Sequence, residues 1–275
     1  MLPRSSLRFR VRSLGTTTRP YRRLMPETHH PRAARTVPDA LAAAVSRLGP
    51  ARPLLTWYDD GTGDRAELSG ATLANWVAKT ANLLVDGCAL DAGDLALVDA
   101  PPHWQTAAVL LGCWSAGLRT ASGPVPAPDV VFAVAGRAAA HAGPGTQVYG
   151  LALAPMAAPL RDPPPGVADF VTGARAHGDH FRPSVPVRPD DPATPAHSHA
   201  DLCRMATQRA RALGLAGGAR VLLDAAAHPD PLDWLLAPLV AGASLVLCAN
   251  LDPARLPGRV SAERVTVTVG RAGQP

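Results

Sequence analysis

Histidines supply the first side chains of this sequence that could do chemistry. His197 and His199 form an H-x-H pair, and His177 and His180 flank Asp179. Imidazole and carboxylate groups at such spacings are ligands for zinc, but a zinc site takes three or four ligands. No third group with a recognisable spacing accompanies either pair. The sequence therefore predicts no metal site.

Nucleophilic side chains make no better case for catalysis. The four cysteines are far apart and never form a C-x-x-C pair, so we expect each to be a small buried hydrophobic residue. Ser115 lies in the stretch WSAG, which lacks the G-x-S-x-G pattern of a hydrolase nucleophile. The carboxylate pairs at 59–60 and 190–191 fall in predicted turns. We therefore assign no catalytic residue.

The candidates for contacting a ligand are His228, Ser198, His199 and Trp234. His228 follows the predicted strand 220–225, and open α/β sheets bind ligands at the carboxyl ends of their strands. The alternative is an ordinary loop histidine. Ser198, with His199 after it, has the side chain of a helix N-cap. Trp234 lies on the apolar face of a predicted helix, which favours a place in the core.

Charge is distributed unevenly along the chain. The net charge is +5, but residues 1–24 contain seven arginines and no acid, which leaves 20 basic and 22 acidic residues elsewhere. The positive charge thus belongs to an arm, which argues against a nucleic-acid-binding domain. We expect residues 1–35 to be a disordered basic arm, or an extension upstream of a true start at Met25. With no apolar signal segment and no run of ~18 apolar residues, we expect a cytoplasmic protein without a membrane partner.

Hydrophobic periodicity predicts alternating strands and helices. Strands are expected at 54–58, 65–68, 95–98, 118–122, 130–134, 147–153, 220–225, 244–248 and 265–269. Helices are expected at 36–48, from 70, from 101, and at 167–176, 200–213, 233–241 and 253–263. Strands separated by helices form βαβ units, so we predict an α/β fold with a mostly parallel sheet flanked by helices. Proline-rich stretches divide the ordered part into segments 36–189 and 190–275.

Several short stretches follow one another in a distinctive order. They are LSGATL (68–73), GDLAL (93–97), SAG (115–117), DDPA (190–193), SHADL (198–202), the segment 214–248 and ERVTVTVG (263–270). This order resembles the N-terminal part of the adenylate-forming superfamily, which includes acyl-CoA synthetases, luciferases and peptide-synthetase adenylation domains. More narrowly, the chain resembles short adenylate-forming-like proteins from GC-rich Gram-positive bacteria. The resemblance covers roughly residues 36–270 and implies a truncated version of that N-terminal domain.

The resemblance also implies a phosphate-binding loop that this sequence lacks. Family members have a Ser/Thr/Gly-rich loop ending in Pro-Lys-Gly between the stretches that correspond to DDPA and SHADL. Here only TPAH (194–197) stands between them, without a glycine or a lysine, and Pro195 has no N–H to donate. Tyr149 and Gly150 are followed by Leu-Ala, which is not the family's aromatic-Gly-x-Thr-Glu motif. Lys79, on an early predicted helix, is the one lysine of the chain.

These departures predict a non-catalytic relative that binds a ligand or a protein partner. We expect no cofactor, with ATP, AMP or CoA as the ligands to test if a pocket is retained. The alternative is an enzyme: a carboxylate-activating ligase with residual activity, or one half of a split synthetase. We also expect a homo-oligomer or a protein partner at the C-terminal edge of the sheet, because an unpaired edge strand is normally covered.

Overall fold

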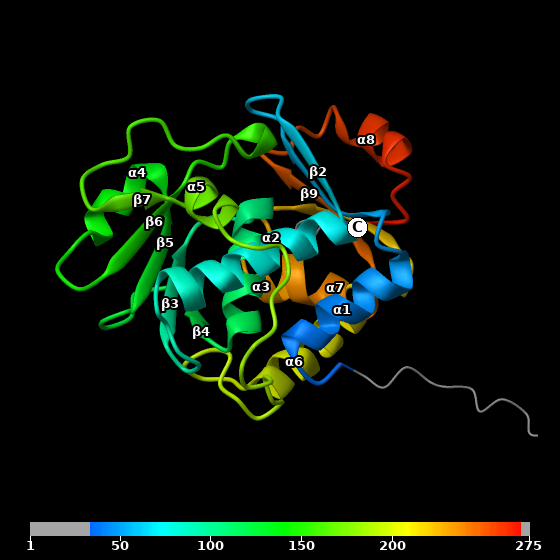
Figure 1. Ribbon diagram of the computed structural model, residues 1–275. Helices are drawn as coiled ribbons and strands as arrows, with labels where there is room; N and C mark the ends of the chain where they lie inside the picture. The colour runs from blue at the N-terminus through cyan, green and yellow to red at the C-terminus, as the bar shows by residue number, and fades with distance from the viewer. Residues whose placement is uncertain (1–33, 271–275) are drawn as a thin grey trace, which may run out of the picture. The chain divides into compact units, whose positions relative to one another are not determined.

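The computed structural model describes residues 34–270 (Figure 1). Its strands are β1 (Pro53–Asp59), β2 (Arg65–Ser69), β3 (Leu95–Asp99), β4 (Arg119–Ala121), β5 (Val130–Val134), β6 (Gln147–Leu151), β7 (Val167–Asp169), β8 (Arg220–Asp224), β9 (Ser244–Ala249) and β10 (Val267–Val269). Its α-helices are α1 (Val37–Leu48), α2 (Gly70–Asn82), α3 (Trp104–Ala116), α4 (Ala135–Ala138), α5 (Phe170–Arg175), α6 (His199–Ala212), α7 (Ala237–Ala241) and α8 (Leu256–Ala262). Single turns of π-helix, η1 (Leu83–Gly87) and η4 (Leu232–Leu236), and of 3-10 helix, η2 (Ala139–His141) and η3 (Pro155–Ala157), complete the set.

The strands form two five-stranded sheets. The first has the order β10-β8-β9-β1-β2, and the second has the order β4-β3-β5-β6-β7. Neighbouring strands are parallel throughout, apart from the β1–β2 hairpin. The predicted α/β fold with mostly parallel sheets is therefore confirmed. The predicted arm, residues 1–35, lies outside the described residues apart from its last two positions.

The first sheet takes strands from both sides of residue 190. β1 pairs in parallel with β9, with Leu55 opposite Leu245, although most of the chain separates them. The segments 36–189 and 190–275 therefore do not correspond to the two sheets, and the described residues 34–270 group as one compact unit. Proline content marked the loop correctly, but strand pairing joins the segments across it.

Two of the predicted helices that begin later than expected have a side-chain cap inside the predicted range. The segment 167–176 starts with strand β7, because the Asp169 carboxylate accepts the Thr172 N–H at 2.6 Å and so caps α5 at Phe170. The helix expected from Pro101 begins at Trp104, where the His103 ring nitrogen Nδ1 accepts the Gln105 N–H at 3.1 Å. A side chain that caps a helix defines its first turn, and in both cases that residue lies inside the predicted range.

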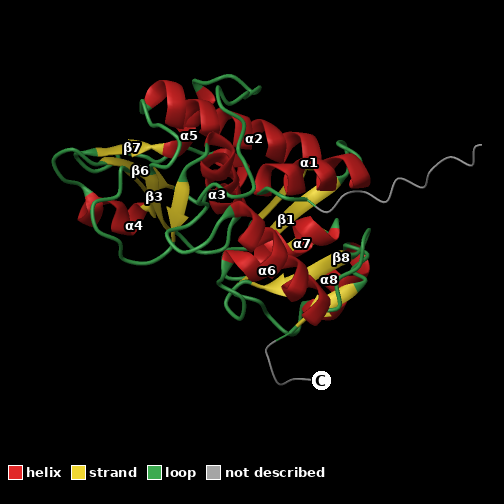
Figure 2. Cartoon of the chain, turned by 90° about the horizontal axis from the view of Figure 1, so that it is seen from below, coloured by secondary structure: helices red, strands yellow, loops and turns green. Residues whose placement is uncertain are grey.

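Helices occupy the space between the sheets and cover their outer faces. α2 and α3 pack against each other; α2 contacts β1 and β2 of the first sheet, and α3 contacts β3 and β4 of the second (Figure 1). α4 and α5 lie on opposite faces of the second sheet (Figure 2). The outer face of the first sheet, with Val246 and Cys248, packs against α8. No helix within residues 34–270 is long and apolar enough to cross a membrane.

Candidate functional site

Residues 193–198 form a short turn. In the family that the sequence resembles, a phosphate-binding loop lies at this place. Pro192 and Ser198 form an antiparallel bridge at the base of the turn. Inside it, the N–H groups of Ala193 and Thr194 both donate to the His197 carbonyl, at 2.9 and 3.0 Å. The chain therefore passes directly from the end of one segment to the start of α6 without an open loop.

The remaining amides of this turn are also engaged. The N–H groups of Ala196 and His197 donate to the Thr194 hydroxyl at 3.3 and 2.9 Å. Those of His199 and Ala200 donate to carbonyls at positions 191 and 189. Pro195 has no N–H, and the Ser198 N–H donates to the Asp201 carboxylate. Every backbone N–H from 193 to 200 therefore has a partner within the protein. None is free for a phosphate.

The N-terminus of α6 carries its own anion. The Asp201 carboxylate accepts the Ser198 N–H at 3.2 Å and the Ser198 hydroxyl at 2.9 Å, and that hydroxyl accepts the Asp201 N–H at 3.2 Å. This reciprocal arrangement is a capping box. The interpretation of Ser198 as a helix N-cap is confirmed, and its contact with a ligand stays a prediction.

The histidine pairs do not come together as ligand groups. His199 is fully buried, its Nδ1 accepts the Val37 N–H at 3.4 Å, and burial lowers its pKa to about 4, whereas His197 is exposed. His180 is almost entirely exposed, 3.8 Å from Asp179. No group of three or more His, Cys, Asp or Glu side chains that could hold a metal occurs within residues 34–270.

His228 is held in a structural network. Its Nδ1 lies 3.2 Å from the Asp233 carboxylate and its Nε2 lies 3.2 Å from the Gly270 carbonyl. Arg209 donates two hydrogen bonds to the same carboxylate, which fixes it. Trp234 is 1% exposed and belongs to the core. None of the four residues proposed from the sequence lines the cavities described below.

A cavity of about 580 Å³ lies at the carboxyl ends of strands from both sheets. We call it the strand-end cavity; its walls follow β1, β3, β6, β8 and β9. It is lined by Trp57, Asp59, Thr62, Asp64, Pro101, Pro102, His103, Ala152, Leu153, Ala154, Pro155, Ala225, Ala226, Ala249 and Asn250. Strand carboxyl ends in open α/β sheets are where ligands bind, so its position favours a binding site.

Two aromatic side chains of the cavity have a buried donor without a partner. His103 and Trp57 pack edge to face with ring centroids 4.4 Å apart. Because His103 Nδ1 accepts the Gln105 N–H, the proton of the neutral ring is on Nε2, which has no hydrogen-bond partner; nor does Nε1 of Trp57. Burial lowers the pKa of His103 to about 3, although the charge of Asp59 opposes this. The ring is therefore neutral at physiological pH.

The more exposed part of the cavity is acidic. Oδ1 of Asp59 accepts hydrogen bonds from the Gly61 N–H and the Asn250 side chain, both at 2.8 Å, and Oδ2 of Asp64 accepts the Thr62 hydroxyl at 2.9 Å. Each carboxylate keeps a second oxygen with no hydrogen-bond partner among the described residues. No arginine or lysine is among the lining residues.

Two of the seven described non-glycine residues with a positive φ angle line this cavity. Leu153 and Asn250 have positive φ angles of 51° and 49°. The Leu153 N–H donates to the buried Gln105 side chain at 3.2 Å, which holds that loop in place. Non-glycine residues in the left-handed region occur preferentially at ligand sites, where the surrounding structure maintains them.

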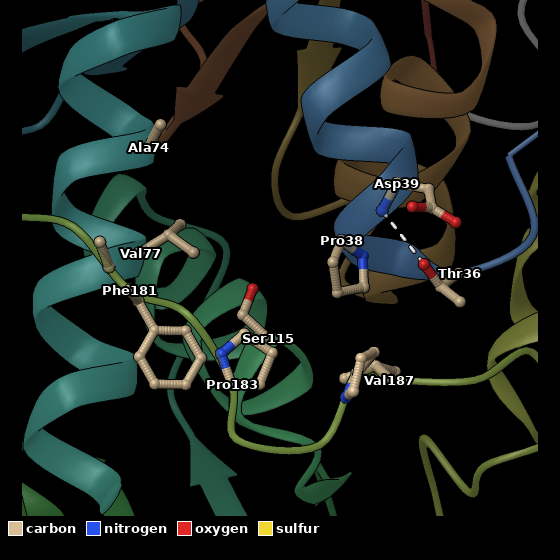
Figure 3. Close-up of a pocket in the computed structure, with 11 residues that line it drawn as sticks. Thr36, Pro38, Asp39, Ala74, Val77, Ser115, Phe181, Pro183 and Val187 are labelled. Atoms are coloured by element: carbon tan, nitrogen blue, oxygen red, sulfur yellow. Dashed lines mark hydrogen bonds between the residues drawn. The ribbon is translucent and has the colours of Figure 1, made fainter. Parts of the chain in front are cut away.

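Two other cavities lack such features. One of about 330 Å³ lies between the start of α1, α2 and the loop that carries Phe181 (Figure 3). Its Thr36 hydroxyl caps α1 by accepting the Asp39 N–H at 3.2 Å, the dashed line in Figure 3. Another, of about 200 Å³, lies beside the short turn and includes Thr194 and His197. Neither has a buried polar atom without a partner among its described lining residues.

Sequence reasoning missed Trp57 and His103. Each lies at or just beyond the end of a predicted strand, which is the signal that drew attention to His228. Hydrophobic periodicity places Trp57 in the predicted strand 54–58 and His103 in the helix expected from 101. Their proximity depends on packing between β1 and the start of α3, which hydrophobic periodicity does not report.

Similarity to known proteins decides the family. The chain is 42% identical over 243 residues to the "TIGR03089 family protein" of Mycobacterium tuberculosis (strain ATCC 25618 / H37Rv), covering 84% of this chain and 98% of that protein. The chain belongs to the TIGR03089 family. No protein-family model matches the sequence of this chain.

Solved structures share the fold of this TIGR03089 family member at low sequence identity. A Brucella canis acyl-CoA synthetase has a TM-score of 0.65 at 20% identity, over 83% of this chain and 46% of that one. A Mycobacterium tuberculosis fatty acyl CoA synthetase has 0.62 at 16%, over 85% and 49%. The N-terminal domain of FACL13 from the same organism has 0.60 at 15%, over 85% and 62%.

The chain thus spans about half the length of the first two of these structures. Its fold is that of the N-terminal part of adenylate-forming enzymes, as the order of motifs indicated. At these identities the likeness establishes the fold of the TIGR03089 family member alone.

Proposed function

We propose that this protein binds a small molecule in the strand-end cavity and does not activate carboxylates with ATP. It is, on this proposal, a non-catalytic member of the adenylate-forming fold. The observation that carries the proposal is the short turn, in which the backbone donors from 193 to 200 all have partners within the protein.

The chemistry of adenylation explains why this turn matters. Attack of a carboxylate on the α-phosphorus of ATP develops negative charge, which amide donors and a cationic side chain must stabilise. Opening the turn to free its donors would break the hydrogen bonds that form it. Lys79 is on α2, where its ammonium donates to the His177 carbonyl at 2.7 Å. The positive N-terminal end of α6 is already matched by Asp201.

The strand-end cavity supports the binding half of the proposal. A volume of about 580 Å³ is within the range of small-molecule sites, roughly 300–1,000 Å³. Buried donors without partners cost about 1–3 kcal/mol each, and a ligand that accepts from them recovers this. The walls combine apolar proline and alanine side chains with a few polar groups, as ligand sites do.

Pyrophosphate release tests the catalytic half. The full chain is mixed with ATP, Mg²⁺ and a panel of carboxylic acids, with an active acyl-CoA synthetase as the positive control. We expect no release above the rate of a protein-free mixture. Turnover by the chain, alone or completed by a second polypeptide, would overturn the proposal in favour of a ligase.

Thermal unfolding tests nucleotide binding separately. ATP, AMP and CoA are each added while the midpoint of unfolding is followed. A ligand at 100 times its dissociation constant stabilises the folded state by roughly 2.7 kcal/mol, which is readily measured. We expect no shift with any of the three, because the cavity has acidic and not basic side chains.

A cytoplasmic location and self-association complete the proposal. All four cysteines are buried and free, as suits a reducing compartment. β10 is an edge of the first sheet, with no partner strand on its outer side among residues 34–270, so a second copy or a protein partner could pair with it. Light scattering after size exclusion at micromolar concentration tests this, and a clean monomer would contradict self-association.

A further inference from the structure

The strand-end cavity has a polar gradient from its buried to its exposed side. Trp57 and His103 are 5% and 1% exposed and carry unpartnered N–H donors. Thr62 and Asn250 are exposed, and Asp59 and Asp64 are partly exposed. The carboxylates therefore belong to the exposed side of the cavity wall, and the two neutral donors belong to its buried side.

Resting on the proposed function, we propose that the strand-end cavity takes a neutral-to-cationic molecule with a carbonyl oxygen at its inner end and an amine at its outer end. The carbonyl accepts from Nε2–H of His103 and Nε1–H of Trp57. The amine donates to the free carboxylate oxygens of Asp59 and Asp64.

The charges of the wall exclude the opposite class of ligand. A carboxylate or phosphate would lie beside two aspartates with no arginine or lysine to compensate, and like charges in a partly desolvated site repel. His103 offers no positive charge, because its ring is neutral. Triphosphates and fatty acids are therefore poor ligands of this cavity, although related folds occur in acyl-CoA synthetases.

The fold also fixes the positions of the His103 and Trp57 N–H donors before a ligand binds. His103 caps α3 through Nδ1, which orients Nε2 and assigns it the proton. Its ring packs edge to face with Trp57, which β1 holds. Preorganised donors bind an acceptor without a further ordering cost.

A matched set of probes tests the proposal. N-acetylputrescine has an acetamide carbonyl at one end and an ammonium at the other. N-butylacetamide lacks the charge, and N-acetyl-γ-aminobutyrate replaces it with a carboxylate. Titration of the ¹⁵N-labelled full chain follows the indole N–H signals, and the Trp57 signal is assigned by its loss in Trp57→Phe. Trp76→Phe, outside the cavity, is the control.

We expect the Trp57 indole signal to shift in a saturable way with N-acetylputrescine. N-butylacetamide should bind about tenfold more weakly, a difference of roughly 1.4 kcal/mol, and N-acetyl-γ-aminobutyrate should not bind. His103→Ser keeps an oxygen that caps α3 but removes the inner N–H, and should weaken N-acetylputrescine about tenfold. Asp59→Asn should reduce the preference for the charged probe, and the double variant Asp59→Asn, Asp64→Asn should abolish it.

Equal or tighter binding of the carboxylate probe would overturn the proposal, as would binding that leaves the Trp57 signal unmoved or no binding by any probe. Asp59→Asn changes a partly exposed side chain, so it keeps the test informative if a buried variant fails to fold. Pyrophosphate release is measured apart from these titrations. Pyrophosphate release would overturn the proposal that the protein does not activate carboxylates, without contradicting the proposed ligand class of the cavity. A failed titration would overturn the proposed ligand class, without contradicting the absence of carboxylate activation.

Discussion

Asp201 and Ser198 bind each other in both directions at the start of α6. The carboxylate accepts the Ser198 N–H, and the Ser198 hydroxyl accepts the Asp201 N–H. A helix N-terminus attracts anions, and here a side chain of the same helix meets that attraction. The positive end of α6 is thus matched by a carboxylate of the protein itself.

Ser198→Ala is expected to lower the free energy of unfolding by about 1 kcal/mol, because an N-cap hydroxyl is lost. Urea unfolding followed by circular dichroism measures it. Ser198→Thr is the matched control and should retain most of the cap. The Trp57 indole titration should be the same in all three proteins, and a loss of binding in Ser198→Ala would return Ser198 to the list of ligand contacts.

Stability should fall on mild acidification because of His103. Burial holds its folded-state pKa at about 3, below the ordinary value of 6.5. Below pH 6.5 the unfolded chain takes up a proton that the folded chain does not, so stability present above 6.5 is lost as the pH falls toward 3. Between about pH 7 and about pH 5 the expected loss is about 2 kcal/mol from this residue.

His199 should also lower the free energy of unfolding as the pH falls, since burial lowers its pKa to about 4. Urea unfolding at the two pH values measures the sum, and His103→Asn should remove the share of His103 while keeping the helix cap. An unchanged pH dependence in that variant would show that the ring does not stay neutral in the folded state.

Close packing of α2 and α3 makes Gly112 intolerant of a side chain. A Cβ at this position would lie 2.6 Å from the Cβ and Cγ2 atoms of Thr80, which is fully buried. Gly112→Ala is expected to destabilise the fold by about 1–3 kcal/mol. In Gly136→Ala, the new Cβ meets nothing within 4 Å, so this variant should be neutral or stabilising by up to about 1 kcal/mol. Thermal unfolding of the pair measures the difference, and equal midpoints would contradict the packing argument.

Arg259 fastens α8 to the first sheet. Its guanidinium donates to the Asp60 carboxylate at 2.9 Å and lies 4.2 Å from the centre of the Tyr58 ring. Asp60 is buried, and its hydrogen bond with Arg259 lowers the pKa of that carboxyl. Arg259→Ala should cost about 3 kcal/mol, because it leaves a buried charge with too few partners.

Arg255→Ala is the comparison for this pair. Arg255 lies 3.6 Å from the same carboxylate but is 55% exposed, so its loss should change the free energy of unfolding by about 0.5 kcal/mol or less. Denaturant unfolding of the two variants distinguishes the contributions. Similar costs would mean that burial of the ion pair is not what gives Arg259 its effect.

Local signals in the sequence were sufficient for much of the fold. Ser198 predicted a helix start, and its hydroxyl accepts a backbone N–H there. The helices expected at 36–48 and from 70 begin at Val37 and Gly70. At 194–197 the resemblance implied a shortened loop, and the chain forms a tight turn there. In these places the residues that determine the structure are neighbours in sequence.

Tertiary pairing explains what was missed. Val167–Asp169 is too short for a periodic signal and becomes a strand because β6 lies beside it. The strand-end cavity could not be predicted, since its walls follow five strands of two sheets. His228 was correctly placed after a strand, but Asp233 and the Gly270 carbonyl occupy its ring nitrogens.

The parallel pairing of β1 with β9 has a consequence for synthesis on the ribosome. The second sheet uses residues 95–169 and can assemble as soon as that stretch has emerged. The β1–β2 hairpin emerges earlier, yet its parallel neighbour does not exist until residue 249 has been translated. During this interval β1 has β2 as its one neighbouring strand among the described residues, and its other edge stays unpaired until β9 has been made.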